Sequence, residues 1–477
     1  MNLDEKAGQL FVIAARAGTP IDELEHHVRD NHVGGVIWFQ STTAETARVN
    51  AHLQSRARVP LLISADLEAG MGMRFADAPW GPPAMAIAAA GDPALAEEQG
   101  RITAAEALRI GVNHILAPVA DVNVDPRNPV INTRSFGENA HDVARYVAAF
   151  VRGVQSEGCL ATAKHFPGHG DTHVDSHRAL PVLDVDRQRL ERVEFVPFRA
   201  AIEAGVASVM IGHLAVPALD DTPAPVRAAF ENVYGTVHDE VTRGGTMPAT
   251  LSKRAIDVLR HELGFDGLVI TDAMDMGGLA AHFDPCEAAV RAIEAGCDQV
   301  LFSPDPDAAI AAVRSRVSET RIDEAVGRVL RAKSRVSDRR SVAERSITLV
   351  RDTHHLLPLR TSRVTTVIVN PHGDPLDDAL RELGETHGDD VLLLLLAIRP
   401  KSGAGTIGVP EEIRELAQRN ARRTIAIAFG SPYILRELGE VSTFVCAWGP
   451  QPVMQIAAMR AVRGEIPMPG TLPVRIE

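Results

Sequence analysis

Residues 160–177 read LATAKHFPGHGDTHVDSH, in which five residues typical of a buried strand run directly into a loop crowded with titratable side chains. Pro167 lacks an amide hydrogen and disfavours a helical residue before it. Gly168 and Gly170 each weaken a helix by roughly 1 kcal/mol relative to alanine. The segment therefore predicts a strand, Leu160 to Lys164, that ends in a polar loop.

The loop places His165, His169, His173 and His177 at every fourth position. On a helix this interval would stack the imidazoles on one face, as in zinc motifs, but the proline and glycines exclude a helix. Side chains alternate in an extended loop, so Asp175 and His177 face the same way and the carboxylate can hold the imidazole. We expect an acid/base pair here and expect the second and third histidines to shape the loop. A polar surface loop and a metal site are the alternatives.

The same order, a short apolar run followed by a stretch of helical periodicity, recurs through the first two thirds of the chain. The eight runs are Gln9 to Ala14, Gly35 to Phe39, Leu61 to Ala65, Asn113 to Pro118, Leu160 to Lys164, Ser208 to Gly212, Leu268 to Thr271 and Asp298 to Phe302. The helical stretches include Pro93 to Ile110, His141 to Glu157, Gln188 to Ala204 and Pro285 to Ala295. Eight strand-then-helix units predict an α/β fold of the (β/α)8 TIM-type barrel class.

Polar residues follow the strands of this predicted barrel. They are Asp66 after the third strand, Asp121 and Asn123 after the fourth, Lys164 and His165 after the fifth, His213 after the sixth and Asp272 after the seventh. Active sites of such barrels lie at the carboxyl ends of the strands. We therefore expect these side chains to meet in one site.

After about residue 340 the pattern changes to a smaller α/β unit. Its expected strands are Thr366 to Asn370, Val391 to Ile398, Thr424 to Phe429 and Thr443 to Ala447. We predict a catalytic barrel domain over residues 1–338 and a three-layer α/β sandwich over 339–477. Three glycines at 403, 405 and 408 have dinucleotide-motif spacing, but no helix clearly opens there and Pro410 follows, which argues against that site.

Composition narrows the class of ligand. The 62 acidic and 49 basic residues give a net charge of −13, which argues against nucleic acid or an anionic membrane as partner and favours a small neutral ligand. The four cysteines are scattered and form no pair at metal-ligand spacing, so reduced thiols and a cytoplasmic protein are expected. The acidic N-terminus has no pattern of an export signal. The oligomeric state is left open.

The residues suit retaining glycoside hydrolysis, which needs a carboxylate nucleophile and a group that donates and then removes a proton. Asp272, at the mouth of a buried strand, fits the first role, with Asp275 as a competitor. His177 fits the second role because histidine titrates near neutrality, and Asp175 would orient it. Lys164, His165 and Arg134 offer donors for sugar hydroxyls and Asp66 accepts them, although Arg134 could instead be a structural salt bridge.

These motifs resemble glycoside hydrolase family 3, and specifically its β-N-acetylglucosaminidase branch. The matching stretches are Lys164 to Gly170 with Asp175 to His177, Arg134 to Gly137, Pro248 to Ser252 and Gly264 to Met274. The resemblance implies that Asp272 forms a covalent glycosyl-enzyme and that His177, paired with Asp175, is the general acid/base. It also implies that Asp66, Arg134, Lys164 and His165 bind the sugar ring, with no metal and no organic cofactor. We add His213 to the expected substrate-binding residues.

The expected function is thus an exo-acting retaining β-N-acetylglucosaminidase that releases terminal β-linked N-acetylglucosamine from cell-wall or chitin-type fragments. One departure concerns the loop after the third strand. Where the branch often has Asp-Gln-Glu-Gly-Gly-Arg, this chain has Asp66-Leu-Glu-Ala-Gly-Met, with Arg74 three residues later, so a role for the missing arginine is open.

Four other functions stay as alternatives. A glycoside phosphorylase is one, because a neutral imidazole repels phosphate less than a glutamate does. A β-glucosidase or β-xylosidase would take a glutamate from the second domain, for which Glu411 and Glu412 are the nearest candidates. A non-catalytic carbohydrate-binding protein and a metal-dependent hydrolase complete the set.

Overall fold

The computed structural model describes residues 1–176, 179–225, 227, 231–232, 235–236, 245–371, 373–374, 376–384, 386–398 and 408–475. The chain divides into two compact units, Met1–Val336 and Ser337–Glu477. The division falls within the long helix α13 (Glu319–Ser346), close to the boundary expected after residue 338.

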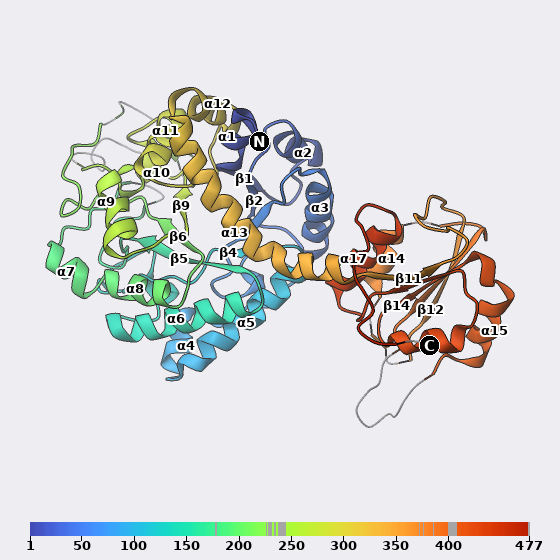
Figure 1. The fold of residues 1–477 in the computed structure, drawn as a ribbon. Coiled ribbons are helices and arrows are strands. Elements are labelled where there is room, and N and C mark those ends of the chain that lie inside the picture. The colour runs from blue at the N-terminus through green and yellow to red at the C-terminus, as the bar shows by residue number, and fades with distance from the viewer. Residues whose placement is uncertain are drawn as a thin grey trace. The chain divides into compact units, whose positions relative to one another are not determined.

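The first unit is a closed barrel of eight parallel strands inside a ring of helices (Figure 1). The strands are β1 (Phe11–Ala15), β2 (Gly35–Trp38), β3 (Leu62–Ala65), β4 (His114–Ile115), β5 (Leu160–Phe166), β6 (Ser208–Ile211), β9 (Leu268–Ala273) and β10 (Gln299–Leu301). β10 pairs with β1 and closes the barrel. The predicted barrel class and all eight predicted strands are confirmed, with ends that differ by a few residues. A short hairpin, β7 (Glu231–Asn232) with β8 (Gly235–Thr236), lies outside the barrel sheet.

The helices of this unit alternate with the strands. They are α1 (Leu3–Gln9), α2 (Ile21–Arg29), α3 (Thr43–Arg56), α4 (Ala84–Ala89), α5 (Pro93–Arg109), α6 (Ala140–Ser156), α7 (Arg187–Arg192), α8 (Phe195–Glu203), α9 (Lys253–Asp257), α10 (Gly277–Ala280), α11 (Pro285–Ala295) and α12 (Pro306–Arg316). The stretch of helical periodicity from Gln188 to Ala204 forms two helices rather than one. Helix α7 ends at Arg192 and α8 begins at Phe195, so the two helices are separate.

Side-chain caps fix where several helices begin. The Asn139 side chain accepts hydrogen bonds from two backbone amides at the start of α6, and Asp284 does the same for α11, where Pro285 occupies the first position. These caps satisfy amide groups that have no partner inside the helix. Helix ends that pack on the barrel are therefore specified locally by the sequence.

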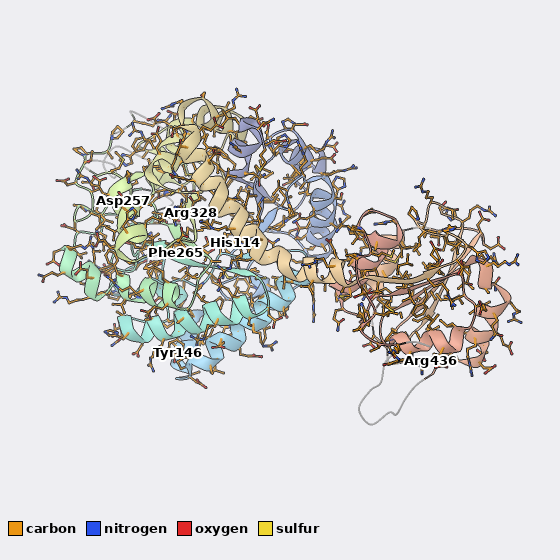
Figure 2. All side chains as sticks on the ribbon, viewed as in Figure 1. His114, Tyr146, Asp257, Phe265, Arg328 and Arg436 are labelled. Atoms are coloured by element: carbon orange, nitrogen blue, oxygen red, sulfur yellow. The ribbon has the colours of Figure 1, made fainter. Side chains whose placement is uncertain are left out.

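Polar groups inside the barrel wall are paired. His114 of β4, labelled in Figure 2, lies 3.1 Å from Ser64 Oγ on β3 and 2.8 Å from Thr162 Oγ1 on β5, and burial lowers its pKa to about 4. Asp298, before β10, is fully buried and contacts three guanidinium groups: Arg260 at 2.6 Å, Arg321 at 3.3 Å and Arg328 of α13, also labelled there, at 3.3 Å. This cluster attaches α13 to the barrel.

The second unit is a mixed sheet covered by helices on both faces. Its strands are β11 (Thr348–Asp352), β12 (Val364–Val369), β13 (Val391–Leu396), β14 (Thr424–Ala428) and β15 (Thr443–Cys446), in the order β11-β15-β14-β13-β12. Its helices are α14 (Asp377–Leu383), α15 (Glu411–Arg419), α16 (Leu435–Leu438) and α17 (Pro452–Val462). Alternate leucines of β13 belong to two separate cores, so the strand is buried on both faces as predicted.

The sequence prediction of four strands in this unit missed β11. This strand pairs antiparallel with β15 at the edge of the sheet, and most of its residues are partly or fully exposed, so it lacks the apolar run that marks the others. Among the described residues, none of the helices combines the length and the apolar character that a membrane crossing requires.

Candidate active site at the carboxyl end of the barrel

Four charged side chains meet at the carboxyl ends of β3 and β5. Lys164 Nζ lies 2.7 Å from both Asp66 Oδ1 and Glu68 Oε1, although the lysine side chain is only 2% exposed. Arg134 donates to Glu68 through Nε at 2.9 Å and Nη2 at 2.8 Å, a two-point guanidinium-carboxylate contact. The structure thus joins Asp66, Lys164 and Arg134, three predicted site residues, through Glu68.

The cluster keeps its carboxylates ionised. Burial raises the pKa of Asp66, but the opposing charges of Lys164 and Arg74 outweigh burial and lower that pKa to about 2. Burial acts in the same direction on Glu68, and Arg134 and Lys164 hold its pKa well below the ordinary value. Conversely, burial lowers the pKa of Lys164, whereas the two carboxylates raise it above its usual range. Both carboxylates and the ammonium are therefore charged at neutral pH.

Arg74 completes the surroundings of Asp66. It lies just after a short 3₁₀ turn, Met71–Met73, and its Nη2 is 2.5 Å from Asp66 Oδ2. This loop, which has Met71 where the branch often has arginine, thus brings the guanidinium of Arg74 to Asp66.

A third carboxylate, Asp121, organises the end of β5. Its oxygens accept hydrogen bonds from the His165 amide at 3.2 and 3.3 Å, from His165 Nδ1 at 2.8 Å and from the His169 amide at 2.7 Å. The proton of His165 is therefore on Nδ1, which leaves Nε2 of a neutral ring with its lone pair. The peptide bond between Lys164 and His165 is cis.

The loop after β5 is held close to the barrel. A Cβ atom at Gly170 would lie 1.8 Å from the carbonyl oxygen of Val122, so only glycine fits there. The Thr172 hydroxyl donates to the His169 carbonyl, so Nδ1 of His169 donates to Thr172 Oγ1 at 2.7 Å and its Nε2 accepts from Ser176 Oγ at 3.0 Å. Burial lowers the pKa of His169 to about 4, which keeps the ring neutral.

This arrangement fixes Ser176, the central residue of the Asp-Ser-His triplet. Asp175 is half-buried beside it, and His173 is exposed. His177, the expected general acid/base, lies outside the described residues. The role expected of His177 stays a prediction from the sequence motif.

Asp272 lies within β9, one residue before the strand ends, and Asp275 lies in the turn beyond it. Both side chains are half-buried. Asp272 Oδ1 accepts a hydrogen bond from the Ala273 amide at 2.8 Å. Its charge also acts on the buried His169 ring, opposing the decrease in pKa that burial causes. Asp272 therefore belongs to the same end of the barrel as the loop after β5.

His213 is fully buried beyond β6. Its Nδ1 lies 2.8 Å from Thr250 Oγ1, and Nε2 lies 2.9 Å from the carbonyl oxygen of Ala273. Because a carbonyl only accepts, Nε2 carries a proton and donates to the residue that follows Asp272. His213 thus contacts the end of β9, and the direct sugar contact expected from the sequence stays a prediction.

Sequence reasoning missed Glu68 and left Asp121 and Arg74 without a role. A signal for Glu68 was present, because only Leu67 separates it from Asp66 and side chains two positions apart in an extended segment share a side. Nothing in the sequence showed that Arg74 would fold back on Asp66, since that contact depends on the 3₁₀ turn between them.

The fold and this charged cluster define a (β/α)8-barrel protein with a polar site at the carboxyl ends of its strands. A family model described as "Glycosyl hydrolase family 3 N terminal domain" matches residues 2–332. The chain therefore belongs to glycosyl hydrolase family 3.

Individual relatives match over most of their length. The chain is 31% identical to a protein of Cellulomonas fimi named beta-N-acetylglucosaminidase/beta-glucosidase, over 99% of this chain and 94% of that protein. It is 34% identical to a beta-hexosaminidase of Nitrosospira multiformis, over 58% of this chain and 75% of that protein. Among solved structures, a family 3 beta-N-acetylglucosaminidase from a Paenibacillus species has a TM-score of 0.63 and 31% identity, covering 100% of this chain and 99% of that one.

Proposed function

We propose that the protein is an exo-acting, retaining β-N-acetylglucosaminidase that hydrolyses terminal β-linked N-acetylglucosamine. The observation that carries the proposal is the joining of Asp66, Glu68, Lys164 and Arg134 in one buried cluster at the barrel end that also holds Asp272. Such a site offers a neutral sugar several charged hydrogen-bonding groups and a separate carboxylate.

The cluster has hydrogen-bonding capacity left for a sugar. Lys164 has three N–H donors, and two of them point to carboxylates, so one is available. Arg134 uses Nε and one N–H of Nη2 on Glu68 and one N–H of Nη1 on the Val130 carbonyl, which leaves two N–H groups. Each oxygen of Asp66 binds one cation and keeps a lone pair, so this ionised carboxylate can accept two sugar hydroxyls.

Asp272 is proposed to attack the anomeric carbon, since β9 and the Ala273 amide hold its carboxylate at the barrel mouth. His177 is proposed to protonate the leaving oxygen and then to deprotonate water, with Asp175 orienting the ring and stabilising its charged form. The contact of His169 with Ser176 supports this assignment because it anchors the residue between the two members of the pair.

The preference for an N-acetylated sugar rests on the Asp-Ser-His triplet and on the names of the relatives. We propose cell-wall or chitin-type fragments as the source of the substrate. Four free cysteines agree with a reducing, cytoplasmic setting.

The test is steady-state hydrolysis of an aryl N-acetylglucosaminide by the unmodified chain and by the variants Asp272→Asn and Asp275→Asn. We expect the first variant to lose turnover while still binding the sugar, and the second to retain most of its turnover. Full activity of Asp272→Asn would remove Asp272 from the nucleophile role and assign that role to Asp275.

The same assay separates the other glycosidase functions. One relative carries beta-glucosidase in its name, so an aryl glucoside should be assayed in parallel. A higher kcat/KM for the glucoside would favour a β-glucosidase. Formation of a glycosyl phosphate when inorganic phosphate is added would instead identify a phosphorylase, and absence of turnover on every glycoside would leave a sugar-binding protein.

A further inference from the structure

Two histidines and an aspartate converge on the outside of the first unit, on helices that contribute nothing to the cluster around Asp66. His26 and His27 are in the last turn of α2, and Asp307 is in the first turn of α12. His27 Nδ1 lies 3.5 Å from Asp307 Oδ1, and His26 Nε2 lies 3.9 Å from the same oxygen. One ligand atom from each of the three residues lies within 4.8 Å of the other two.

These separations are close to what a first-row metal requires. Zinc bonds of about 2.0–2.2 Å in a tetrahedral arrangement place neighbouring ligand atoms about 3.4 Å apart. The His27–Asp307 separation already has this value, and His26 is half-exposed, so its ring has room to close the remaining gap.

The positions of the protons on the two imidazoles also leave lone pairs that can bind a metal. His26 Nδ1 lies 2.9 Å from Asp30 Oδ2, and because a carboxylate only accepts, Nδ1 carries the proton and Nε2 keeps its lone pair. A ring nitrogen held by a carboxylate is the usual outer partner of a metal-bound histidine. The Asn31 amide donates a hydrogen bond to His27 Nδ1 at 3.0 Å and another to Asp307 Oδ1. The lone pair of His27 Nδ1 therefore faces the space beside Asp307 Oδ1.

We propose that His26 Nε2, His27 Nδ1 and Asp307 Oδ1 form a binding site for Zn²⁺ or a similar first-row transition metal ion. Two imidazoles and one carboxylate suit such ions and do not suit Mg²⁺ or Ca²⁺, which prefer oxygen ligands. The Asn31 amide would swing aside when the ion enters, and water would complete the coordination.

The site has a structural consequence that does not depend on the proposed function. α2 follows β1 and α12 follows β10, the two strands whose pairing closes the barrel. An ion shared by these helices would link the first and last repeats of the barrel. Because it would bind the folded chain alone, it would raise the melting temperature with increasing Zn²⁺.

The experiment is calorimetric titration of the metal-stripped full-length chain with Zn²⁺, with melting temperatures measured in parallel. The variants are His26→Gln and Asp307→Asn, whose side chains are 50% and 59% exposed and can be replaced without disturbing the core. Asp30→Asn tests the outer partner, and His52→Gln, a histidine of α3 that bonds Glu25, is the matched control.

We expect one Zn²⁺ per chain and a higher melting temperature in its presence. Both ligand variants and Asp30→Asn should weaken binding by about tenfold or more, whereas His52→Gln should leave it unchanged. Mg²⁺ should produce no thermal shift. Failure to bind one Zn²⁺ per chain, or equal affinity in the ligand variants and the unmodified chain, would overturn the proposal.

Discussion

Replacing Glu194 with glutamine should remove a pH dependence from the stability of the barrel. Glu194 lies between α7 and α8 and is only 2% exposed. Its Oε1 accepts from Arg189 Nη2 at 3.3 Å, but that guanidinium also serves Asp171 at 3.1 Å. Its Oε2 has no hydrogen-bond partner in the described part of the chain. Burial raises the pKa of Glu194 to about 7, and the shared Arg189 charge only partly opposes this.

The size of the effect follows from proton linkage. The raised pKa means that the folded chain holds a proton on Glu194 that the unfolded chain releases near pH 4.5. The contribution of this proton to the free energy of unfolding is fully present below about pH 4.5 and is lost as pH rises through about 7. The pKa of Glu194 differs by about 2.5 between the folded and the unfolded chain. At 1.36 kcal/mol for each unit of pKa, this difference amounts to about 3 kcal/mol of unfolding free energy. Of this, about 2.5 kcal/mol should be lost between pH 5 and pH 8.

The assay is urea denaturation at pH 5 and pH 8 of the unmodified chain, Glu194→Gln and the control Glu191→Gln. Glu191 is 46% exposed on the neighbouring helix, where it pairs with Arg187. Relative to Glu194→Gln, the unmodified chain and the control should each lose about 2.5 kcal/mol of unfolding free energy on going to pH 8. If Glu194→Gln and the unmodified chain instead show the same pH dependence, Glu194 is not held protonated and the argument fails.

Three further substitutions test other parts of the structure. Glu68→Gln removes the counter-charge of Arg134 and Lys164, so the unfolding free energy should fall by about 3–5 kcal/mol. The KM for an aryl N-acetylglucosaminide should also rise. Denaturation curves and kinetics that match those of the unmodified chain would contradict this. Arg74→Ala should lower kcat/KM about tenfold with the circular dichroism spectrum unchanged, because Asp66 loses one of its two cations, a loss of about 1.4 kcal/mol. Lys333→Met should stabilise the chain by about 3 kcal/mol at pH 7, because burial lowers the pKa of Lys333 to about 7 and its bond to Gln9 offsets only part of the cost. This gain should shrink in denaturation curves as pH rises from 7 towards 10.5, since the unfolded lysine then also loses its proton.

The sequence predicted the barrel well because each of its strands is a short apolar run bounded by polar or glycine residues. The edge strand β11 escaped prediction because most of Thr348 to Asp352 is at least partly exposed and carries no such run. The break between α7 and α8 escaped for a different reason. The turn at Glu194 directs a carboxyl group into the interior, and periodicity of apolar residues does not report such a turn.

The candidate site was predictable in part. Residues at or just beyond the carboxyl end of a strand, such as Lys164 in β5 and Asp66 after β3, could be placed at the barrel mouth from topology alone. Contacts between loops could not be placed, because they depend on how each loop folds back. Glu68 joins Arg134 to Lys164 across three separate chain segments, and Arg74 reaches Asp66 through a turn.

The most direct test of the proposed mechanism is to locate the covalent intermediate. A fluorinated N-acetylglucosaminide with a good leaving group should form the glycosyl-enzyme faster than water releases it, and peptide mass spectrometry would then find the modified residue. We expect one sugar per chain, attached to Asp272, and no adduct in Asp272→Asn. Attachment to Asp275, or turnover of the substrate with no adduct on any aspartate, would contradict it.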